Sequence, residues 1–142
     1  MALAADIFPD TTFPLTLAAG PVAIRTGLAR ILASGPLMAL SADHRATAEI
    51  VLAEVLNNIA EHAYSGGPGD IFIQLAATPT GLECRIADRG LEMPGGTPPA
   101  GVLPQEELPE GGFGWYLIRS LTQGLIFQRK DGQNLLQFVI PA

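Results

Sequence analysis

The stretch that decides the fold is residues 53–62, which read AEVLNNIAEH. Apolar residues recur through it at the spacing of an amphipathic helix. Glu54 and Asn58 stand one turn apart, on the edge away from the apolar stripe. His62 follows one further turn on, near the border of that stripe. Polar residues on such a helix usually face water, so their position alone does not identify a site.

Around this stretch the sequence predicts an alternation of helices and strands. Ser41 is a good N-cap for the long helix, which we expect to reach about Tyr64 before a glycine-rich turn. Before it, we predict a strand over residues 13–18 and a helix over residues 21–34. After it, we expect strands over 70–78 and 82–88, a helix over 115–122, and a hairpin of strands over 125–129 and 134–140.

The strand over residues 82–88 ends in the tripeptide DRG. Alternate residues of this strand are apolar and face the core, and Asp88 has the same parity. A carboxylate on the core side is costly unless a group donates to it, so we expect a ligand, a cap or a bound water beside Asp88. An Asx-turn through Gly90 is the simplest of these. The same alternation makes Cys84 a small core residue rather than a nucleophile.

A glycine cluster, GGFG at residues 111–114, opens the next helix. Backbone amides at a helix start are unsatisfied, and glycine lets them approach phosphate oxygens. On its own such a cluster is as typical of a hinge or of tight helix packing. The segment before it, residues 91–110, holds five of the 12 prolines and shows no helical or strand period. Loops of this kind are usually lids, binding loops or disordered segments.

Composition excludes several classes of protein. The chain has 142 residues, a formal net charge of -6 and 48% hydrophobic residues, which fits one compact domain. An acidic chain lacks the basic face that non-specific nucleic-acid binding or binding to an anionic membrane requires. The N-terminus has no basic region, and no apolar run reaches the length of a membrane span, so we expect a cytoplasmic protein. One cysteine and two histidines provide neither a disulfide nor a zinc cluster.

The polar residues of the long helix suit phosphoryl transfer. Magnesium prefers oxygen ligands and takes one or two of them from protein, with the remainder from phosphates and water, so the amide oxygen of Asn58 can serve. A carboxylate one turn away, that of Glu54, can accept a proton from an attacking hydroxyl group.

These motifs resemble the N-box, G1 box and G2 box of the GHKL ATPases, and most closely those of the anti-sigma-factor serine kinases. The most specific parts are EVLNNIAEHAY at 54–64 and GWYLIRSL at 114–121, and the resemblance covers about residues 15–140. It implies a Bergerat-type fold, an α/β two-layer sandwich with a mixed β-sheet and helices packed on one face. The whole chain, residues 1–142, would then be one domain, with an N-terminal extension over 1–12 and an ATP lid over 91–111.

The resemblance also implies ATP and Mg²⁺ as cofactors and gives each motif residue a role. Glu54 would be the catalytic base, Asn58 the magnesium ligand and Asp88 the acceptor for the adenine amino group. Gly90 would make room for the adenine base. His62 would line the site or pack at the helix border. The triphosphate would be held by the second glycine box: Gly111, Gly112, Phe113 and Gly114.

Two features depart from the family pattern. Glu92 stands where the G1 box usually has its second glycine, and no Lys or Arg lies between Gly90 and Gly114. Arg119 is the next basic residue, and it would contact phosphate or form a surface ion pair.

Two functions follow from the resemblance. The first is an ATP-dependent serine/threonine protein kinase that phosphorylates an anti-sigma antagonist, binds a sigma factor and forms a homodimer, with no direct contact to nucleic acid or membrane. The alternative is a non-catalytic, nucleotide-sensing module that sequesters a partner protein. Glu92 and the uncharged segment after Gly90 favour this alternative.

Overall fold

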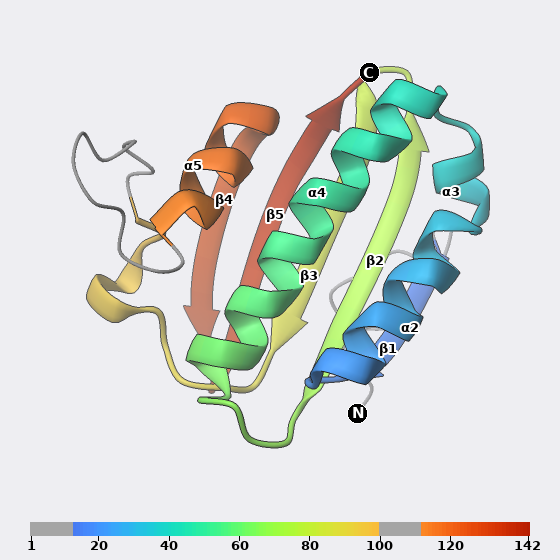
Figure 1. Cartoon of the computed structure of the whole chain (residues 1–142). Helices are drawn as coiled ribbons and strands as arrows, with labels where there is room; N and C mark the ends of the chain where they lie inside the picture. Colours follow the sequence, from blue (N-terminus) through green and yellow to red (C-terminus); the bar gives the residue numbers. More distant parts are fainter. Residues whose placement is uncertain (1–12, 100–111) are drawn as a thin grey trace.

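Helices cover one face of a five-stranded sheet in the computed structural model, which describes residues 13–99 and 112–142 (Figure 1). The predicted two-layer α/β sandwich is therefore confirmed. The N-terminal extension, Gly111 and the larger part of the candidate lid lie outside the described residues, and so do the side chains of Gly112 and Phe113. In the described part of the chain, no helix combines the length and the apolar composition that crossing a membrane requires.

The sheet is antiparallel throughout. Its strands run in the order β1-β2-β3-β5-β4. Their bounds are Phe13–Ala18 for β1, Asp70–Thr78 for β2, Gly81–Asp88 for β3, Gln123–Lys130 for β4 and Gln133–Pro141 for β5. All four pairings between neighbours are antiparallel, so the expectation of a mixed sheet is wrong. Tight hairpins join β2 to β3 and β4 to β5, and a hairpin makes its two strands antiparallel. The other two pairs, β1 with β2 and β3 with β5, are joined through helices and are antiparallel as well.

The second hairpin places β5 beside β3. At its turn, Asp131 and Gly132 have φ values of 53° and 76°, as the Asp-Gly pair predicts for a two-residue connection. β5 then pairs with β3 along its length, and Asn134 lies directly opposite Asp88. A residue 46 positions away in sequence thus meets the end of β3.

The first helical segment differs from its prediction. α2 (Pro21–Leu32) ends two residues before Ser34, and a short helix, α3 (Gly35–Met38), follows where the sequence suggested only a stop. The buried Ser34 hydroxyl donates to the Ile31 carbonyl at 2.6 Å, which ends α2. Ser34 then occupies the N-cap of α3, whose first turn contains proline.

The long helix starts as predicted and ends differently. In α4 (Ala42–Asn58) the Ser41 hydroxyl accepts from the His44 backbone N–H at 3.2 Å. The helix was expected to continue to Tyr64, but η1 (Ile59–Ala63) is a π-helical turn in which the Tyr64 N–H donates to the Ile59 carbonyl at 3.0 Å. A π-turn inserts a residue and shifts the side chains that follow, and such turns are frequent at functional sites.

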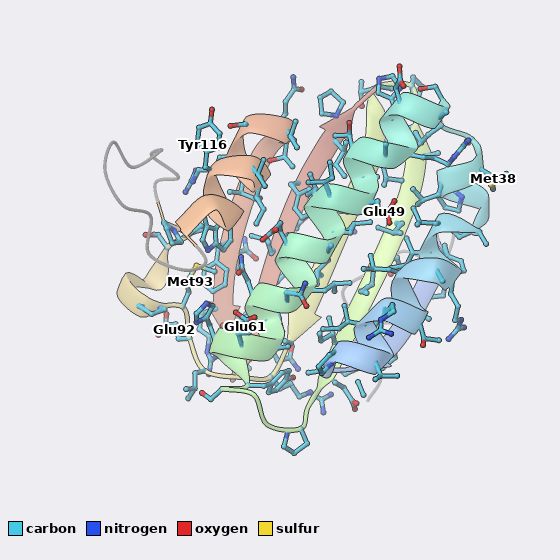
Figure 2. The ribbon with its side chains drawn as sticks, viewed as in Figure 1. Met38, Glu49, Glu61, Glu92, Met93 and Tyr116 are labelled. Carbon is cyan, nitrogen blue, oxygen red and sulfur yellow. The ribbon has the colours of Figure 1, made fainter. Side chains whose placement is uncertain are left out.

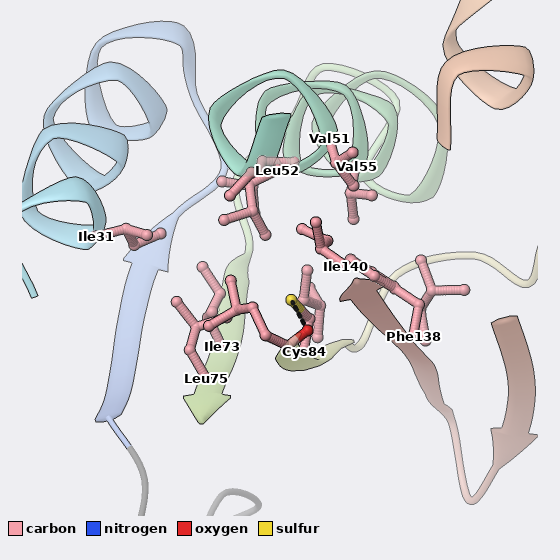
Figure 3. Close-up of a cluster of buried hydrophobic side chains, with 14 of the residues drawn as sticks. Ile31, Val51, Leu52, Val55, Ile73, Leu75, Cys84, Phe138 and Ile140 are labelled. Atoms are coloured by element: carbon pink, nitrogen blue, oxygen red, sulfur yellow. Dashed lines mark hydrogen bonds between the residues drawn. The ribbon is translucent and has the colours of Figure 1, made fainter. Parts of the chain in front are cut away.

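The core lies between α4 and the sheet. Figure 3 shows Val51, Leu52 and Val55 of α4 directed at Ile73, Leu75, Cys84, Phe138 and Ile140 of the strands. The prediction that Cys84 is a core residue is confirmed: the residue is 1% exposed, and burial raises the pKa of its thiol. The remaining elements, η2 (Pro94–Gly96) and α5 (Gly112–Leu121), follow β3, and α5 packs beside α4 (Figure 1).

Candidate functional site

Glu54 and Asn58 face the first turn of α5. Gly114 is buried there, and a Cβ atom at this residue would lie 2.8 Å from Glu54 Oε2, 3.6 Å from Asn58 Nδ2 and 3.7 Å from Asn58 Oδ1. A side chain at this position would displace the Glu54 carboxylate from the place that it occupies between the two helices. The structure brings these three predicted site residues together, although Gly114 is 60 positions from Glu54 in the sequence.

The side-chain amide of Asn58 is only partly satisfied. Its Nδ2 atom is buried and has no hydrogen-bond partner among the described residues. A buried amide nitrogen without an acceptor costs about 1–3 kcal/mol, and groups of this kind commonly mark a functional position. We therefore interpret Asn58 as a residue placed for a ligand rather than for the fold.

The donor set near Asn58 fits magnesium that arrives with phosphates. Glu54 and Asn58 offer oxygen atoms, and Mg²⁺ typically takes one or two protein oxygens and completes its shell with phosphate and water. Within residues 13–99 and 112–142, no group of three or more His, Cys, Asp and Glu side chains could hold a metal alone. Asn58 as the magnesium ligand stays a prediction.

Asp88 ends β3 on the helix-covered side of the sheet and is 3% exposed. Its Oδ1 accepts hydrogen bonds from the Gly90 backbone N–H and from Asn134 Nδ2, both at 2.8 Å. The first bond confirms the predicted Asx-turn. Burial raises the pKa of the Asp88 carboxyl group, while the two hydrogen bonds and the nearby Arg129 oppose that rise.

The C-terminal hairpin supplies residues that sequence reasoning missed. Asn134 is 5% exposed, and its Nδ2 also donates to the Leu91 carbonyl at 2.9 Å. Arg129, on β4, donates through Nη1 to Asn134 Oδ1 at 3.0 Å and to the Gly90 carbonyl at 2.6 Å. The only sequence signal was the polar Asn134 at a core-facing position of a strand.

Gly90 brings the π-turn and the end of β3 together. The Leu91 N–H donates to the Ala63 carbonyl at 2.7 Å, and a Cβ atom on Gly90 would overlap that carbonyl group. That Gly90 makes room for the adenine base stays a prediction. The contact that the structure describes is with the backbone of η1, and it fixes the end of the α4–η1 segment beside Asp88.

Tyr64 strengthens the same junction. Its hydroxyl group donates to the Asp70 carbonyl at 2.7 Å and accepts from the Arg89 N–H at 2.8 Å. Its ring occupies the space that a side chain on Gly69 would need. Tyr64 thus ties three segments together: the end of η1, the start of β2 and the turn after β3. Its place in the 54–64 motif was noted, but no role was assigned to it.

The other predicted residues are placed as follows. His62 is exposed within η1, so the expectation that it packs at the helix border is wrong. The reason is that the π-turn moves His62 out of the register of the apolar stripe. Lining the site stays a prediction for His62. Gly112 and Phe113 form the start of α5, and Gly111 lies outside the described residues.

Arg119 is held by backbone carbonyls, and its contact with phosphate stays a prediction. Nε donates to the Pro99 carbonyl at 2.6 Å and Nη2 to the Pro98 carbonyl at 3.0 Å, so in the part of the chain described here it forms no ion pair. Both expectations assumed an anionic partner, but a guanidinium group donates equally well to backbone carbonyls. Arg119 thereby fastens the segment after β3 to α5.

Acidic side chains surround this end of the molecule. Figure 2 shows Glu92 and Met93 on the segment that runs from β3 towards α5, and Glu61 near the end of the long helix. Glu61 and Glu92 are both exposed, and Glu92 folds over η2, where its Oε2 would lie 3.6 Å from a Cβ atom on Gly96. A polyphosphate entering here would need a cation to offset these carboxylates.

Comparisons with known proteins agree with this arrangement. The chain is 30% identical over 105 residues to serine-protein kinase RsbW of Bacillus mycoides (strain KBAB4), which is 70% of this chain and 66% of that protein. It is 31% identical over 94 residues to serine-protein kinase RsbW of Bacillus cereus (strain AH820), covering 62% and 59% of the two chains. The matched part thus spans less than two thirds of the length of these relatives.

A family model described as histidine kinase-like ATPase domain matches residues 14–140, which includes every described element from β1 to β5 apart from the first and last residues of the sheet. Such a domain implies ATP binding. The chain belongs to the histidine kinase-like ATPase domain family.

Proposed function

We propose that this protein is an ATP-dependent serine/threonine protein kinase that acts on an anti-sigma antagonist and binds a sigma factor. The observation that carries the proposal is the approach of Glu54 and Asn58 to Gly114, which leaves a carboxylate and an amide beside the glycine-rich start of α5. The relatives named serine-protein kinase support the same reaction class.

The residues divide the chemistry between two ends of the site. At one end, the Asp88 carboxylate accepts a hydrogen bond from the amino group of adenine. At the other, Asn58 would hold magnesium through its amide oxygen, and the metal would supply positive charge beside the transferring phosphoryl group. The substrate hydroxyl oxygen attacks the γ-phosphorus, ADP leaves, and Glu54 takes the hydroxyl proton.

The remaining features fit around this reaction. The start of α5, from Gly112 to Gly114, offers backbone amides to the triphosphate, and residues 91–111 act as the lid. His62 lines the site. The protein works as a homodimer, and its partners are the antagonist that it phosphorylates and the sigma factor that it holds.

Phosphate transfer tests the proposal directly. The protein is incubated with γ-labelled ATP, magnesium and a candidate antagonist, and label on the antagonist is measured for the wild type and for Glu54→Gln. The matched control is Glu49→Gln, which makes the same change at an exposed position of the same helix (Figure 2). We expect transfer to fall by at least about 100-fold in Glu54→Gln, within the contribution of a general base, and to be unchanged in the control. Equal transfer by all three proteins would contradict the role of Glu54.

A second function, a nucleotide-sensing module that sequesters its partner without transferring phosphate, is favoured by one observation. Arg119, the first basic residue after Arg89, uses its Nε and Nη2 groups to bind the Pro99 and Pro98 carbonyls. Ligand-dependent unfolding separates the two functions. A nucleotide at 100 times its dissociation constant should stabilise the protein by roughly 2.7 kcal/mol, and such stabilisation without transfer would select the sequestering function.

A further inference from the structure

The Asp88 carboxylate uses its two oxygens unequally. Both recorded hydrogen bonds, from the Gly90 N–H and from Asn134 Nδ2, are made to Oδ1. Among the described residues no donor reaches Oδ2. The carboxylate therefore presents one oxygen that is already committed to the protein and one that is available as an acceptor.

Arg129 determines which way round the Asn134 amide lies. A guanidinium group can only donate hydrogen bonds, so the amide atom that faces Arg129 Nη1 at 3.0 Å must be the oxygen. The NH₂ group must then face Asp88 and the Leu91 carbonyl. A flipped amide would set its oxygen against the carboxylate and its NH₂ group against the guanidinium, which is unfavourable at both ends.

The same arginine fixes the turn itself. Its Nη1 also donates to the Gly90 carbonyl at 2.6 Å, so one guanidinium holds both the turn after β3 and the amide that faces Asp88. Arg129 is exposed and lies on the edge strand β4, where no packing requirement of the core explains these contacts.

We infer that Asn134 and Arg129 are positioning residues that hold Asp88 as an ionised acceptor with one free oxygen, and so make the site selective for a purine that carries an amino group at position 6. This inference rests on the proposed use of Asp88 to bind adenine. A protonated carboxyl group would present a donor instead, and a donor suits a purine with a carbonyl at that position. The hairpin would therefore contribute to base selection without touching the base.

Charge around Asp88 is consistent with such control. Among the described residues, the charged and titratable groups that act on Asp88 are Arg129 on β4 and the hydroxyl group of Tyr64 beside η1. Burial disfavours the ionised carboxylate, and the donors from Asn134 and Gly90 favour it. Without the Asn134 donor, less would oppose the rise in the pKa of Asp88 that burial causes.

Two variants and one matched control test the inference. Asn134→Leu removes the donor and keeps a side chain that branches at Cγ with the same number of heavy atoms, and Arg129→Met removes the group that orients the amide. Lys130→Met makes a similar change at the next residue of β4, which is exposed and has no recorded bond to the site. Titration of the ¹³C-labelled Asp88 carboxyl group in the nucleotide-free protein should show a higher midpoint in both variants than in the wild type and in Lys130→Met.

Calorimetry gives the second measurement. ATP affinity near neutral pH should fall about tenfold or more in Asn134→Leu and in Arg129→Met, which corresponds to a lost hydrogen bond to a charged group, and should stay within twofold in the control. The preference for ATP over inosine triphosphate, which has a carbonyl at position 6, should fall in parallel. Asn134 is buried, so Asn134→Leu can fail to fold. In that case Arg129→Met, at an exposed residue, tests the inference alone.

The outcomes separate this inference from the proposed function. An unchanged Asp88 midpoint in both variants would overturn the positioning role whatever the nucleotide data show. If the midpoint shifts in the variants but the wild-type protein binds no adenine nucleotide, the proposed function is overturned, and base selectivity with it. Shifted midpoints with unchanged ATP affinity would overturn the link between Asn134 and the base.

Discussion

Replacing Gly114 with alanine should separate the stability of this protein from its activity. The added methyl carbon would lie 2.8 Å from Glu54 Oε2, which is closer than side-chain carbons ordinarily approach, and 3.6 Å from Asn58 Nδ2, which is an ordinary contact. The atom that must move is therefore the end of the flexible Glu54 side chain. No backbone atom outside α5 stands in the way.

The expected sizes of the two effects differ. Glu54 Oε2 has to retreat by about 0.6 Å to reach the 3.4 Å at which ordinary contact begins. Displacements near 1 Å in a catalytic group cost roughly 100-fold in rate, so we expect phosphate transfer to fall about 10- to 100-fold. Alanine is a better helix former than glycine by about 1 kcal/mol in a helix interior, so the unfolding temperature should stay the same or rise by about 2–4 °C.

The assay compares thermal unfolding with transfer of labelled phosphate from ATP to a candidate antagonist. Gly35→Ala is the control, because that glycine is also helical and a Cβ atom there would have nothing within 4 Å. It should match Gly114→Ala in stability and the wild type in activity. Full activity of Gly114→Ala would refute the placement of Glu54 as base. A loss of stability above about 1 kcal/mol would show that the contact between Gly114 and Glu54 serves the fold and not the site.

Three further changes have distinct expected results. Asn58→Leu should leave the urea midpoint unchanged or higher, because it removes a buried nitrogen without a partner, while isothermal titration should show loss of magnesium-dependent ATP binding. Burial raises the pKa of Asp88 above its usual value of 3.8, so the contribution of Asp88 to stability should be greatest below pH 3.8 and should decline as the pH rises through the folded-state pKa. ATP affinity should instead increase over the same range, because the carboxylate becomes ionised. Both pH dependences should weaken in Asp88→Asn. Gly90→Ala forces a methyl group against the Ala63 carbonyl, and chemical denaturation should report a loss of about 1–3 kcal/mol.

Much of the fold could be predicted from local patterns. The strand from Gly81 to Asp88 alternates buried and partly exposed residues between Leu82 and Ile86, and the Asp-Gly pair at 131–132 specifies a tight hairpin, so both elements follow from short-range rules. Ser41 marked the start of α4 for the same reason. The Asx-turn at Asp88 was predictable because the acceptor and the donor are two residues apart.

Other features depend on contacts that no local pattern contains. The bond from Asn134 to Asp88 joins residues 46 positions apart, and that from Arg129 to the Gly90 carbonyl joins residues 39 apart. Helical periodicity also continues past Asn58, yet the helix changes to a π-turn at Ile59. The Leu91 N–H donates to the Ala63 carbonyl at the end of η1, and the Tyr64 hydroxyl group, just after η1, donates to the Asp70 carbonyl, so these two bonds fix the backbone there. Tertiary contacts thus override the local helical signal.

The described contacts also divide the candidate site into two halves of different character. Around Asp88, Asn134 donates to Oδ1 of the carboxylate, Arg129 donates to the Gly90 carbonyl in the following turn, and the Tyr64 hydroxyl group beside the π-turn accepts from the Arg89 N–H. Beside Gly114, by contrast, Asn58 Nδ2 has no partner within the described residues. Under the proposed function, an adenine base would therefore meet a preformed acceptor, whereas the end beside Gly114 would gain the missing partner of Asn58 only from a bound ligand. Binding energy from the first half can then offset the cost of ordering the second, which is how a preorganised subsite contributes to a reaction at a distance from it.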